Sequence, residues 1–240
     1  MEPSDSLDRR ARFATHLFQR VRWDDLNPTW LLAGVERAMD EDLGGGGFRQ
    51  RPERPGDATT AAAIAQQKGT AAIVARVPMV LAGMPLVPLI LSVYGGKVNL
   101  TLDYADGDAV PGGTVVGTLT GPVSELLPAE RIILNYLQRL CGIATLTARF
   151  VEALGADGPK LLDTRKTTPG MRALEKYAVA LGGGWNHRRG LYDRIMLKDN
   201  HLAATGSDRG ERLANAVREA RDARPDLPVE VEVDDLAQVP

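Results

Sequence analysis

Charged side chains follow three short apolar runs in the second half of the chain. Arg165 and Lys166 follow the first run, Lys198 follows the second, and Glu232 lies within the third. Segments with helical spacing separate the runs, so we expect strand–helix units of a parallel sheet or barrel. Because the carboxyl ends of parallel strands share one face, these cations and carboxylates would meet in one cleft.

The segment 160–201 is strongly basic within a chain whose net charge is only −2. It holds nine Lys or Arg residues and four Asp or Glu residues, a local charge of +5. Such a field suits a small polyanion, namely a phosphate, a pyrophosphate or a dicarboxylate, which guanidinium groups bind in a bidentate manner. No aromatic platform for base stacking accompanies the cations, which argues against RNA as the ligand.

Three glycines precede His187 and Arg188, so the backbone there can approach a ligand closely. His187 alone could equally be a structural hydrogen-bonding group. His201 could cap a loop or orient a neighbour, because no second histidine stands at a metal-ligating spacing. Glu230 and Glu232 should share one strand face, either as a solvated edge or as hard oxygen ligands that suit Mg²⁺ and a diphosphate.

Composition excludes several classes of protein. The 240 residues are 44% hydrophobic and 25% charged, which is typical of a globular chain. The near-neutral balance argues against nucleic-acid and membrane partners. The single cysteine, Cys141, rules out a disulfide within the chain and predicts a reducing, cytoplasmic location, with the thiol in core packing rather than catalysis. The uncharged run 77–94 is short and rich in proline for a membrane span.

Periodicity predicts an α/β chain with two domains. An N-terminal α/β sandwich should occupy residues 1–128, and an open, incomplete α/β barrel should occupy residues 129–240. The expected strands are 71–77, 86–94, 98–104 and 114–119, together with the three runs ending near 164, 198 and 233. The expected helices are 9–23, 28–42, 130–154, 169–181 and 209–224, with an exposed loop over 44–55.

Four motifs occur in an order that resembles the quinolinate phosphoribosyltransferase family. The longest is LLDTRKTTPGMRALEKYAVALGGGWNHRRGLYDRIMLKDNHL, which covers residues 161–202. The others are PGDATT (55–60), AERIILNYLQRLCGIAT (129–145) and VEVEVDDLAQV (229–239). The resemblance extends over residues 28–240 and combines several motifs, so it is more specific than any one of them.

The resemblance implies a reaction and assigns roles. Family members convert quinolinate and phosphoribosyl pyrophosphate, with Mg²⁺, to nicotinate mononucleotide, pyrophosphate and CO₂ on the route to NAD. The resemblance implies catalytic roles for Lys166, Lys198 and Glu232, the last toward the ribose hydroxyls or the metal. The implied substrate-binding residues are Arg131, Arg165, Lys166, His187, Arg188, Lys198 and Glu232. Arg131 would enter the neighbouring site of a homodimer, and a hexamer remains open.

Two other readings remain open. The molybdenum-associated relative of this family would use a different acceptor, although it diverges around the His-Arg and Lys-Asp-Asn-His positions that are retained here. Family members also continue beyond the position of Pro240, into strand ends that bind phosphate. The barrel is therefore expected to be incomplete, and the third reading is a truncated, inactive chain that acts only as a dimer partner.

Overall fold

The computed structural model describes residues 19–64, 66–206 and 209–239, which belong to two compact units. A large unit comprises residues 20–163 and 167–185. A small unit comprises, among the described residues, Gln19, 164–166 and 186–239. The expected helix 9–23 lies mostly outside the described residues. Its described end is not α-helical: Gln19 forms an isolated β-bridge, Arg22 is extended, and a 3-10 turn begins at Trp23.

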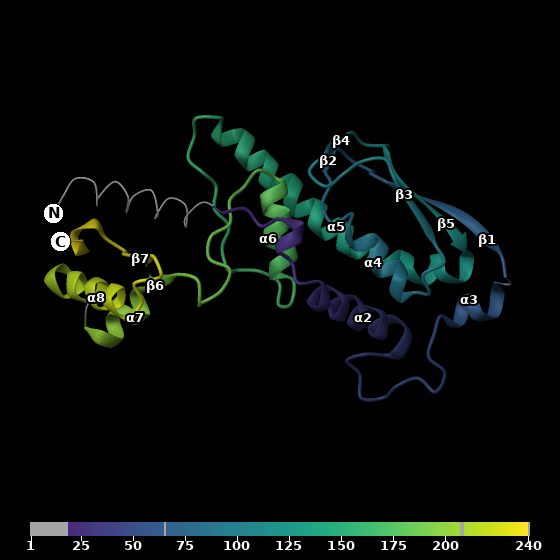
Figure 1. Ribbon diagram of the computed structural model, residues 1–240, viewed down its shortest axis with the longest axis horizontal. Helices are drawn as coiled ribbons and strands as arrows, with labels where there is room; N and C mark the ends of the chain where they lie inside the picture. The colour runs from purple at the N-terminus through teal and green to yellow at the C-terminus, as the bar shows by residue number, and fades with distance from the viewer. Residues whose placement is uncertain (1–18, 65, 207–208, 240) are drawn as a thin grey trace. The chain divides into compact units, whose positions relative to one another are not determined.

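The large unit contains an antiparallel sheet in which β5 lies between β1 and β3 (Figure 1). A separate antiparallel pair joins β2 and β4. These strands confirm the β-rich texture expected over 71–77, 98–104 and 114–119. The bounds are β1 (Lys68–Val74), β2 (Met79–Val80), β3 (Asn99–Leu102), β4 (Ala109–Val110) and β5 (Val115–Pro122).

The strand expected over 86–94 is wrong, because this segment forms the helix α4 (Leu86–Val93). Its buried side chains are spaced as on one helical face: Leu86, Val87, Ile90 and Leu91. A short, wholly apolar run fits a buried strand and a buried helix equally well, so periodicity alone could not decide. The backbone just before α4 is held by Asp106, whose carboxylate accepts hydrogen bonds from Gly83 N–H at 2.8 Å and Met84 N–H at 2.9 Å.

The long helix α5 (Val123–Leu154) organises the large unit. It contacts α4, the sheet strands and α6 (Arg172–Leu181), and its apolar face is buried at helical spacing through Ile133, Leu137 and Leu140. Two shorter helices begin at side-chain caps: Asn27 caps α2 (Pro28–Gly44) and Asp57 caps α3 (Ala58–Ala63). The expected helices over 28–42, 130–154 and 169–181 are thereby confirmed, while the proposed domain boundary at 128/129 falls inside α5 and stays a prediction.

The small unit is built on two parallel strands joined through helices. Strand β6 (Ile195–Leu197) pairs in parallel with β7 (Val229–Val231), and the chain between them forms α7 (Asp199–Thr205) and α8 (Gly210–Ala223). This is the strand–helix–strand unit from which parallel barrels are assembled. Helix α8 contacts β7 and buries Leu213, whereas the 3-10 turn Leu236–Gln238 follows the second strand.

The first of the three expected barrel strands, ending near 164, is not formed. Among the described residues, Leu162 makes one isolated parallel bridge to Trp185. The amide of Trp185 donates to Leu161 O at 2.8 Å, and the amide of Asp163 donates to Trp185 O at 3.0 Å. A strand needs a continuous ladder with a neighbour, and this segment has its backbone partner at one position only.

The length and hydropathy of the described helices can be compared with what a membrane span requires. Among residues 19–239, apart from the undescribed positions, no helix combines the length and apolar character needed to cross a bilayer.

Asp106 provides the stability test of this fold. Its carboxylate also accepts a hydrogen bond from Tyr177 Oη at 2.8 Å, so one side chain satisfies three donors of the large unit. Asp106→Ala should lower the free energy of unfolding by about 2–3 kcal/mol in urea titrations, because buried donors lose their acceptor. The control Asp103→Ala, at an exposed position, should change it by less than about 0.5 kcal/mol.

Candidate functional site

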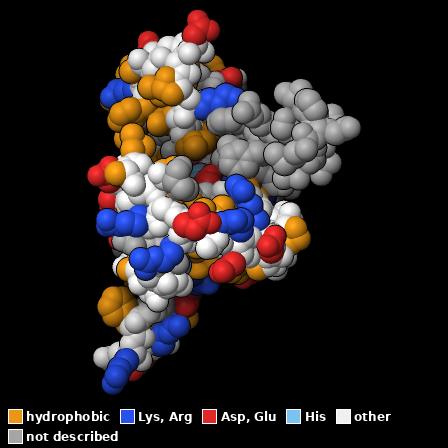
Figure 2. Space-filling model, turned by 90° about the vertical axis from the view of Figure 1, so that its left-hand side faces the viewer, with side chains coloured by type: hydrophobic (Ala, Val, Ile, Leu, Met, Phe, Trp, Pro, Cys, Tyr) orange, Lys and Arg blue, Asp and Glu red, His pale blue; other side chains and the backbone are white. Residues whose placement is uncertain are grey.

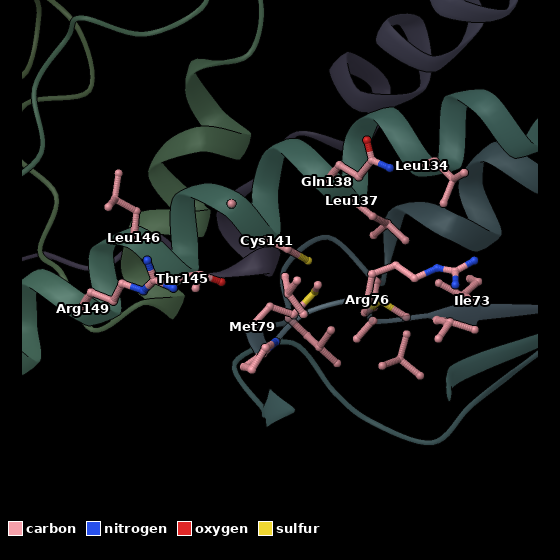
Figure 3. A pocket seen from close by; sticks show the side chains of 18 residues that line it. Ile73, Arg76, Met79, Leu134, Leu137, Gln138, Cys141, Thr145, Leu146 and Arg149 are labelled. Atoms are coloured by element: carbon pink, nitrogen blue, oxygen red, sulfur yellow. The ribbon is translucent and has the colours of Figure 1, made fainter. Parts of the chain in front are cut away.

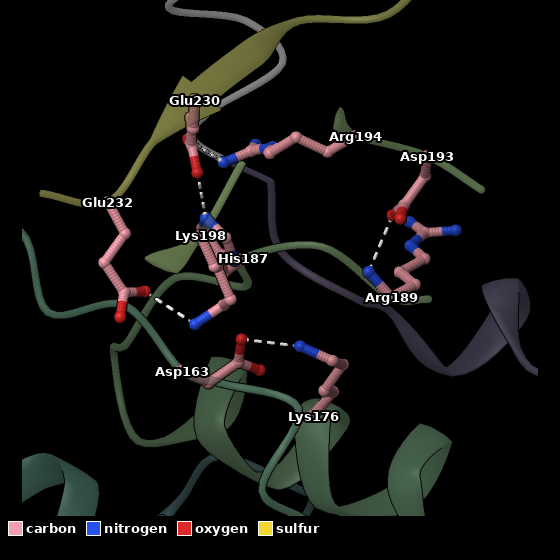
Figure 4. Close-up of polar contacts among 9 residues, drawn as sticks. All are labelled: Asp163, Lys176, His187, Arg189, Asp193, Arg194, Lys198, Glu230 and Glu232. Atoms are coloured by element: carbon pink, nitrogen blue, oxygen red, sulfur yellow. Dashed lines mark hydrogen bonds and ion pairs between the residues drawn. The ribbon is translucent and has the colours of Figure 1, made fainter. Parts of the chain in front are cut away.

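The ends of β6 and β7 bring Lys198 and Glu232 together. Leu197 and Val231 are paired in register, so the residues that follow them emerge side by side. The ammonium nitrogen of Lys198 lies 2.6 Å from Oε2 of Glu232 (Figure 4). Lys198 is 36% exposed and Glu232 is 53% exposed, so the pair is accessible from solvent. Either side chain could therefore leave the ion pair and bind a ligand instead.

A second group of side chains lies around Glu230, on β7 itself. Nε2 of His187 is 2.7 Å from one carboxylate oxygen of Glu230, and Nη1 of Arg194 is 2.5 Å from the other. Arg194 is nearly buried, at 3% exposure, and Glu230 and His187 are 20% and 14% exposed. The carboxylate therefore links the segment after the glycine triplet to strand β7 (Figure 4).

Arg188 lies beside this group and is buried. Burial lowers the pKa of its guanidinium, and the positive charges of Arg165 and Arg194 lower it further, while Asp193 and Glu230 oppose the shift. A guanidinium remains charged under these conditions, so its positive charge stands in an unfavourable environment. An anionic ligand that reached it would relieve this repulsion, because guanidinium groups bind carboxylate and phosphate.

Asp193 and His201 form hydrogen bonds to the backbone of the small unit. The carboxylate of Asp193 accepts hydrogen bonds from the amides of Arg189 and Gly190, at 2.6 and 3.1 Å. Nδ1 of His201 accepts from the amide of Lys198 at 3.1 Å, so this histidine caps the start of α7. The sequence had left two roles open for His201, capping a loop and orienting a neighbour, and the structure shows capping.

Two further predicted site residues are placed as follows. Lys166 is exposed in the small unit, where its amide donates to Thr164 Oγ1 at 3.0 Å. Arg131 is exposed on α5 in the large unit. The small unit thus contains all the predicted site residues except Arg131: Arg165, Lys166, His187, Arg188, Lys198 and Glu232.

Sequence reasoning did not find the contacts of Glu230 and Arg194 in the small unit, nor a buried ion pair in the large unit. Glu230 and Arg194 were recognised only as members of an acidic row and a basic cluster. In the large unit, Lys176 forms an ion pair with Asp163 at 2.6 Å, and both side chains are almost fully buried (Figure 4). The sequence indicates that Glu230 shares a strand face with Glu232, because the two are two residues apart on one strand. It does not indicate that His187 and Arg194 contact Glu230.

A cavity of about 410 Å³ lies in the large unit, between the β1–β2 region and α5 (Figure 3). Most of its lining is apolar, and Arg76 and Arg149 stand among the labelled side chains. None of the predicted site residues lines it. Cys141 does, but its thiol hydrogen-bonds the backbone of Ala82, and burial raises the pKa of the thiol. The thiol is thus poorly suited to act as a nucleophile.

Charge on the surface is mixed. The face in Figure 2 shows Lys and Arg side chains interspersed with Asp and Glu. The described residues include no group of three or more His, Cys, Asp or Glu side chains placed to hold a metal ion.

Comparison with known proteins identifies two family models along the chain. The model described as quinolinate phosphoribosyl transferase, N-terminal domain, matches residues 57–141, and that described as its C-terminal domain matches residues 143–240. A probable nicotinate-nucleotide pyrophosphorylase [carboxylating] of Bacillus subtilis is 44% identical over 185 residues. The nicotinate-nucleotide pyrophosphorylase [carboxylating] of Mycobacterium leprae is 42% identical over 209 residues.

Solved structures agree with this match. The nicotinate-nucleotide pyrophosphorylase of Francisella tularensis superposes with a TM-score of 0.78 at 34% identity, covering 88% of this chain and 70% of that one. The match to the Bacillus subtilis relative covers 77% of this chain and 62% of the relative, and that to the Mycobacterium leprae relative covers 85% and 68%. The chain thus spans about two thirds of the length of these proteins.

The thiol of Cys141 offers a test of this assignment of the site. A raised pKa leaves less thiolate at any given pH, and burial denies access, so both effects slow the reaction with a disulfide reagent. At pH 8 the folded chain should react with dithiobis(nitrobenzoate) about 100-fold or more slowly than the urea-unfolded chain. Equal rates would show an accessible thiol of ordinary reactivity and contradict its burial, and a faster rate in the folded chain would indicate an activated thiol.

Proposed function

Because the chain belongs to the quinolinate phosphoribosyltransferase family, we propose that it transfers phosphoribose from phosphoribosyl pyrophosphate to quinolinate with loss of CO₂. The products would be nicotinate mononucleotide and pyrophosphate, on the de novo route to NAD. The observation that carries the proposal is the cluster of buried and half-buried guanidinium groups around Arg188 in the small unit. A pyridine dicarboxylate supplies the two negative charges that such a cluster favours.

The proposed binding roles are those that the family resemblance implies, applied to the residues of the small unit. Arg165 and Arg188 would receive the carboxylates of quinolinate, with His187 beside them and Lys166 at the exposed side. Lys198 would exchange its bond to Glu232 for one to substrate. Glu232, released from Lys198, would accept the ribose hydroxyls of the phosphoribosyl donor.

The transfer step needs no protein nucleophile. The pyridine nitrogen of quinolinate forms a bond to C1 of the ribose while the bond from C1 to pyrophosphate breaks, and the electron pair leaves on pyrophosphate. Positive charge develops on the ribose ring in this step. Positioning of the two substrates and electrostatic stabilisation of the leaving group would supply most of the rate acceleration.

Decarboxylation follows from the charge that transfer creates. The ring nitrogen is then quaternary, so the bond between C2 and its carboxylate can break with its electron pair left on C2, and CO₂ departs. A proton then replaces the carboxylate. The ammonium groups of Lys166 and Lys198 would stabilise the negative charge at C2 before that proton arrives.

Magnesium would be bound mainly by the phosphoribosyl donor. Mg²⁺ usually keeps several waters and takes one or two carboxylates together with substrate phosphates, and Glu232 is an exposed carboxylate that fits this role. When bound, the ion would neutralise charge that develops on the departing pyrophosphate. Within the described residues no larger set of acidic or histidine ligands is preformed.

The assembly and location are part of the same proposal. We propose a homodimer in which Arg131, exposed on α5, enters the site of the partner and adds a further cation for the substrate. Both a dimer and a hexamer satisfy this arrangement. A cytoplasmic location suits both the free thiol of Cys141 and a pathway of soluble metabolites.

The direct test combines purified chain, quinolinate, phosphoribosyl pyrophosphate and Mg²⁺, and follows nicotinate mononucleotide together with released CO₂. The proposal predicts equal amounts of both products. It also predicts, by calorimetry, at least about tenfold tighter binding of quinolinate than of nicotinate, which lacks the second carboxylate. Transfer to another base without CO₂ would favour the molybdenum-associated relative, and binding without turnover would favour an inactive partner.

Lys166 and Lys198 provide the mutational test. Lys198→Ala and Lys166→Ala should each lower kcat by about 100-fold, because each removes a charge that stabilises the transition state more than the ground state. The matched control is Lys97→Ala, which removes a 76%-exposed lysine of the large unit and should leave kcat unchanged. Full activity in either site variant would exclude that lysine from catalysis.

A further inference from the structure

Glu230 occupies an unusual position between two cationic or potentially cationic groups. Each of its carboxylate oxygens contacts a different partner, Nε2 of His187 at 2.7 Å and Nη1 of Arg194 at 2.5 Å. It stands on the strand β7, whereas His187 and Arg194 flank the loop that Asp193 closes. A single carboxylate therefore fixes the position of this loop relative to the strand.

The surroundings make a carboxylate necessary at this place. Burial lowers the pKa of Arg188, and the positive charges of Arg165 and Arg194 lower it further. Glu230 and Asp193 are the two carboxylates that counter this repulsion at Arg188. Of these two, Glu230 also contacts His187, which the proposed function places in the substrate pocket.

We infer that Glu230 is a positioning residue that holds His187, with Nε2 protonated, in the orientation that the anionic substrate requires. The carboxylate has no proton to donate, so the hydrogen bond to His187 requires that Nε2–H be the donor. Arg194 holds the other oxygen and prevents rotation of the carboxylate. This inference rests on the proposed function, because it assigns His187 to the same quinolinate pocket.

Glu232 does not share this role, although it stands two residues further along the same segment. It is 53% exposed and contacts Lys198, so it can reach a ligand from solvent. Glu230 is 20% exposed, and its carboxylate contacts His187 and Arg194. The two carboxylates thus have different roles: Glu230 positions His187, and Glu232 contacts the substrate.

Glu230→Gln is the informative substitution because the amide has the same shape but only one acceptor atom. It cannot accept from both His187 and Arg194, and the buried, charged guanidinium should take the amide oxygen. The amide NH₂ then faces His187 and favours the ring with Nε2 unprotonated. Selective ¹⁵N-histidine labelling reports this directly, because the sequence contains only three histidines and a His187→Gln sample assigns the signal.

The expected result has two parts. In the unmutated chain His187 should show a protonated Nε2, and in Glu230→Gln that proton should be lost. The Kd for quinolinate should rise by about 10- to 100-fold, by analogy with the loss of a carboxylate that orients a metal-binding histidine, and the Kd for phosphoribosyl pyrophosphate should change less than about twofold. Glu219→Gln, on the exposed side of α8, is the matched control and should alter neither quantity.

The inference and the proposed function can fail separately. A Glu230→Gln chain that keeps both the Nε2–H signal and the original Kd for quinolinate would overturn the inference, as would equal weakening of both substrates, which indicates a general structural role. If the unmutated chain binds no quinolinate, the proposed function fails, while the ¹⁵N spectra still decide whether Glu230 holds His187. Glu230→Asp, whose shorter side chain cannot span both partners, should reproduce the weaker binding if Glu230→Gln does not fold.

Discussion

The site depends on the repulsion between guanidinium groups that the fold forces together. Arg188 is buried beside Arg165 and Arg194, and both burial and like charge disfavour its ionised form. Proteins tolerate such an arrangement when carboxylates or a ligand compensate it. Glu230 and Asp193 offset part of the charge at Arg188. In the proposed function, the remaining positive charge would favour a dianionic substrate.

Parallel strand pairing makes this concentration of charge possible. In-register pairing of β6 and β7 places the residues after Leu197 and Val231 side by side, and those residues are Lys198 and Glu232. The large unit contributes differently: α5 carries its apolar core, while Arg131 is displayed on the surface of the same helix. One long helix therefore serves both packing and, in the proposed dimer, catalysis.

Most of the secondary structure and several of the site residues could be predicted from the sequence, for identifiable physical reasons. Helix α2 was recognisable from Asn27 and Pro28, and β6 and β7 from short apolar runs bounded by charged residues. Helix α4 was not, because a run of apolar residues without alternation fits either structure. The roles of Glu230 and Arg194 were also hidden, since a sequence reports the face of a strand but not the partners that tertiary packing brings to it.

The measurement that tests the central claim most directly is a crystal structure of this chain with quinolinate bound. The account predicts both carboxylates within hydrogen-bonding distance of the guanidinium groups of Arg165 and Arg188, with His187 still held by Glu230. Quinolinate bound elsewhere, for example in the apolar cavity beside Cys141, with the arginine cluster unchanged, would contradict it.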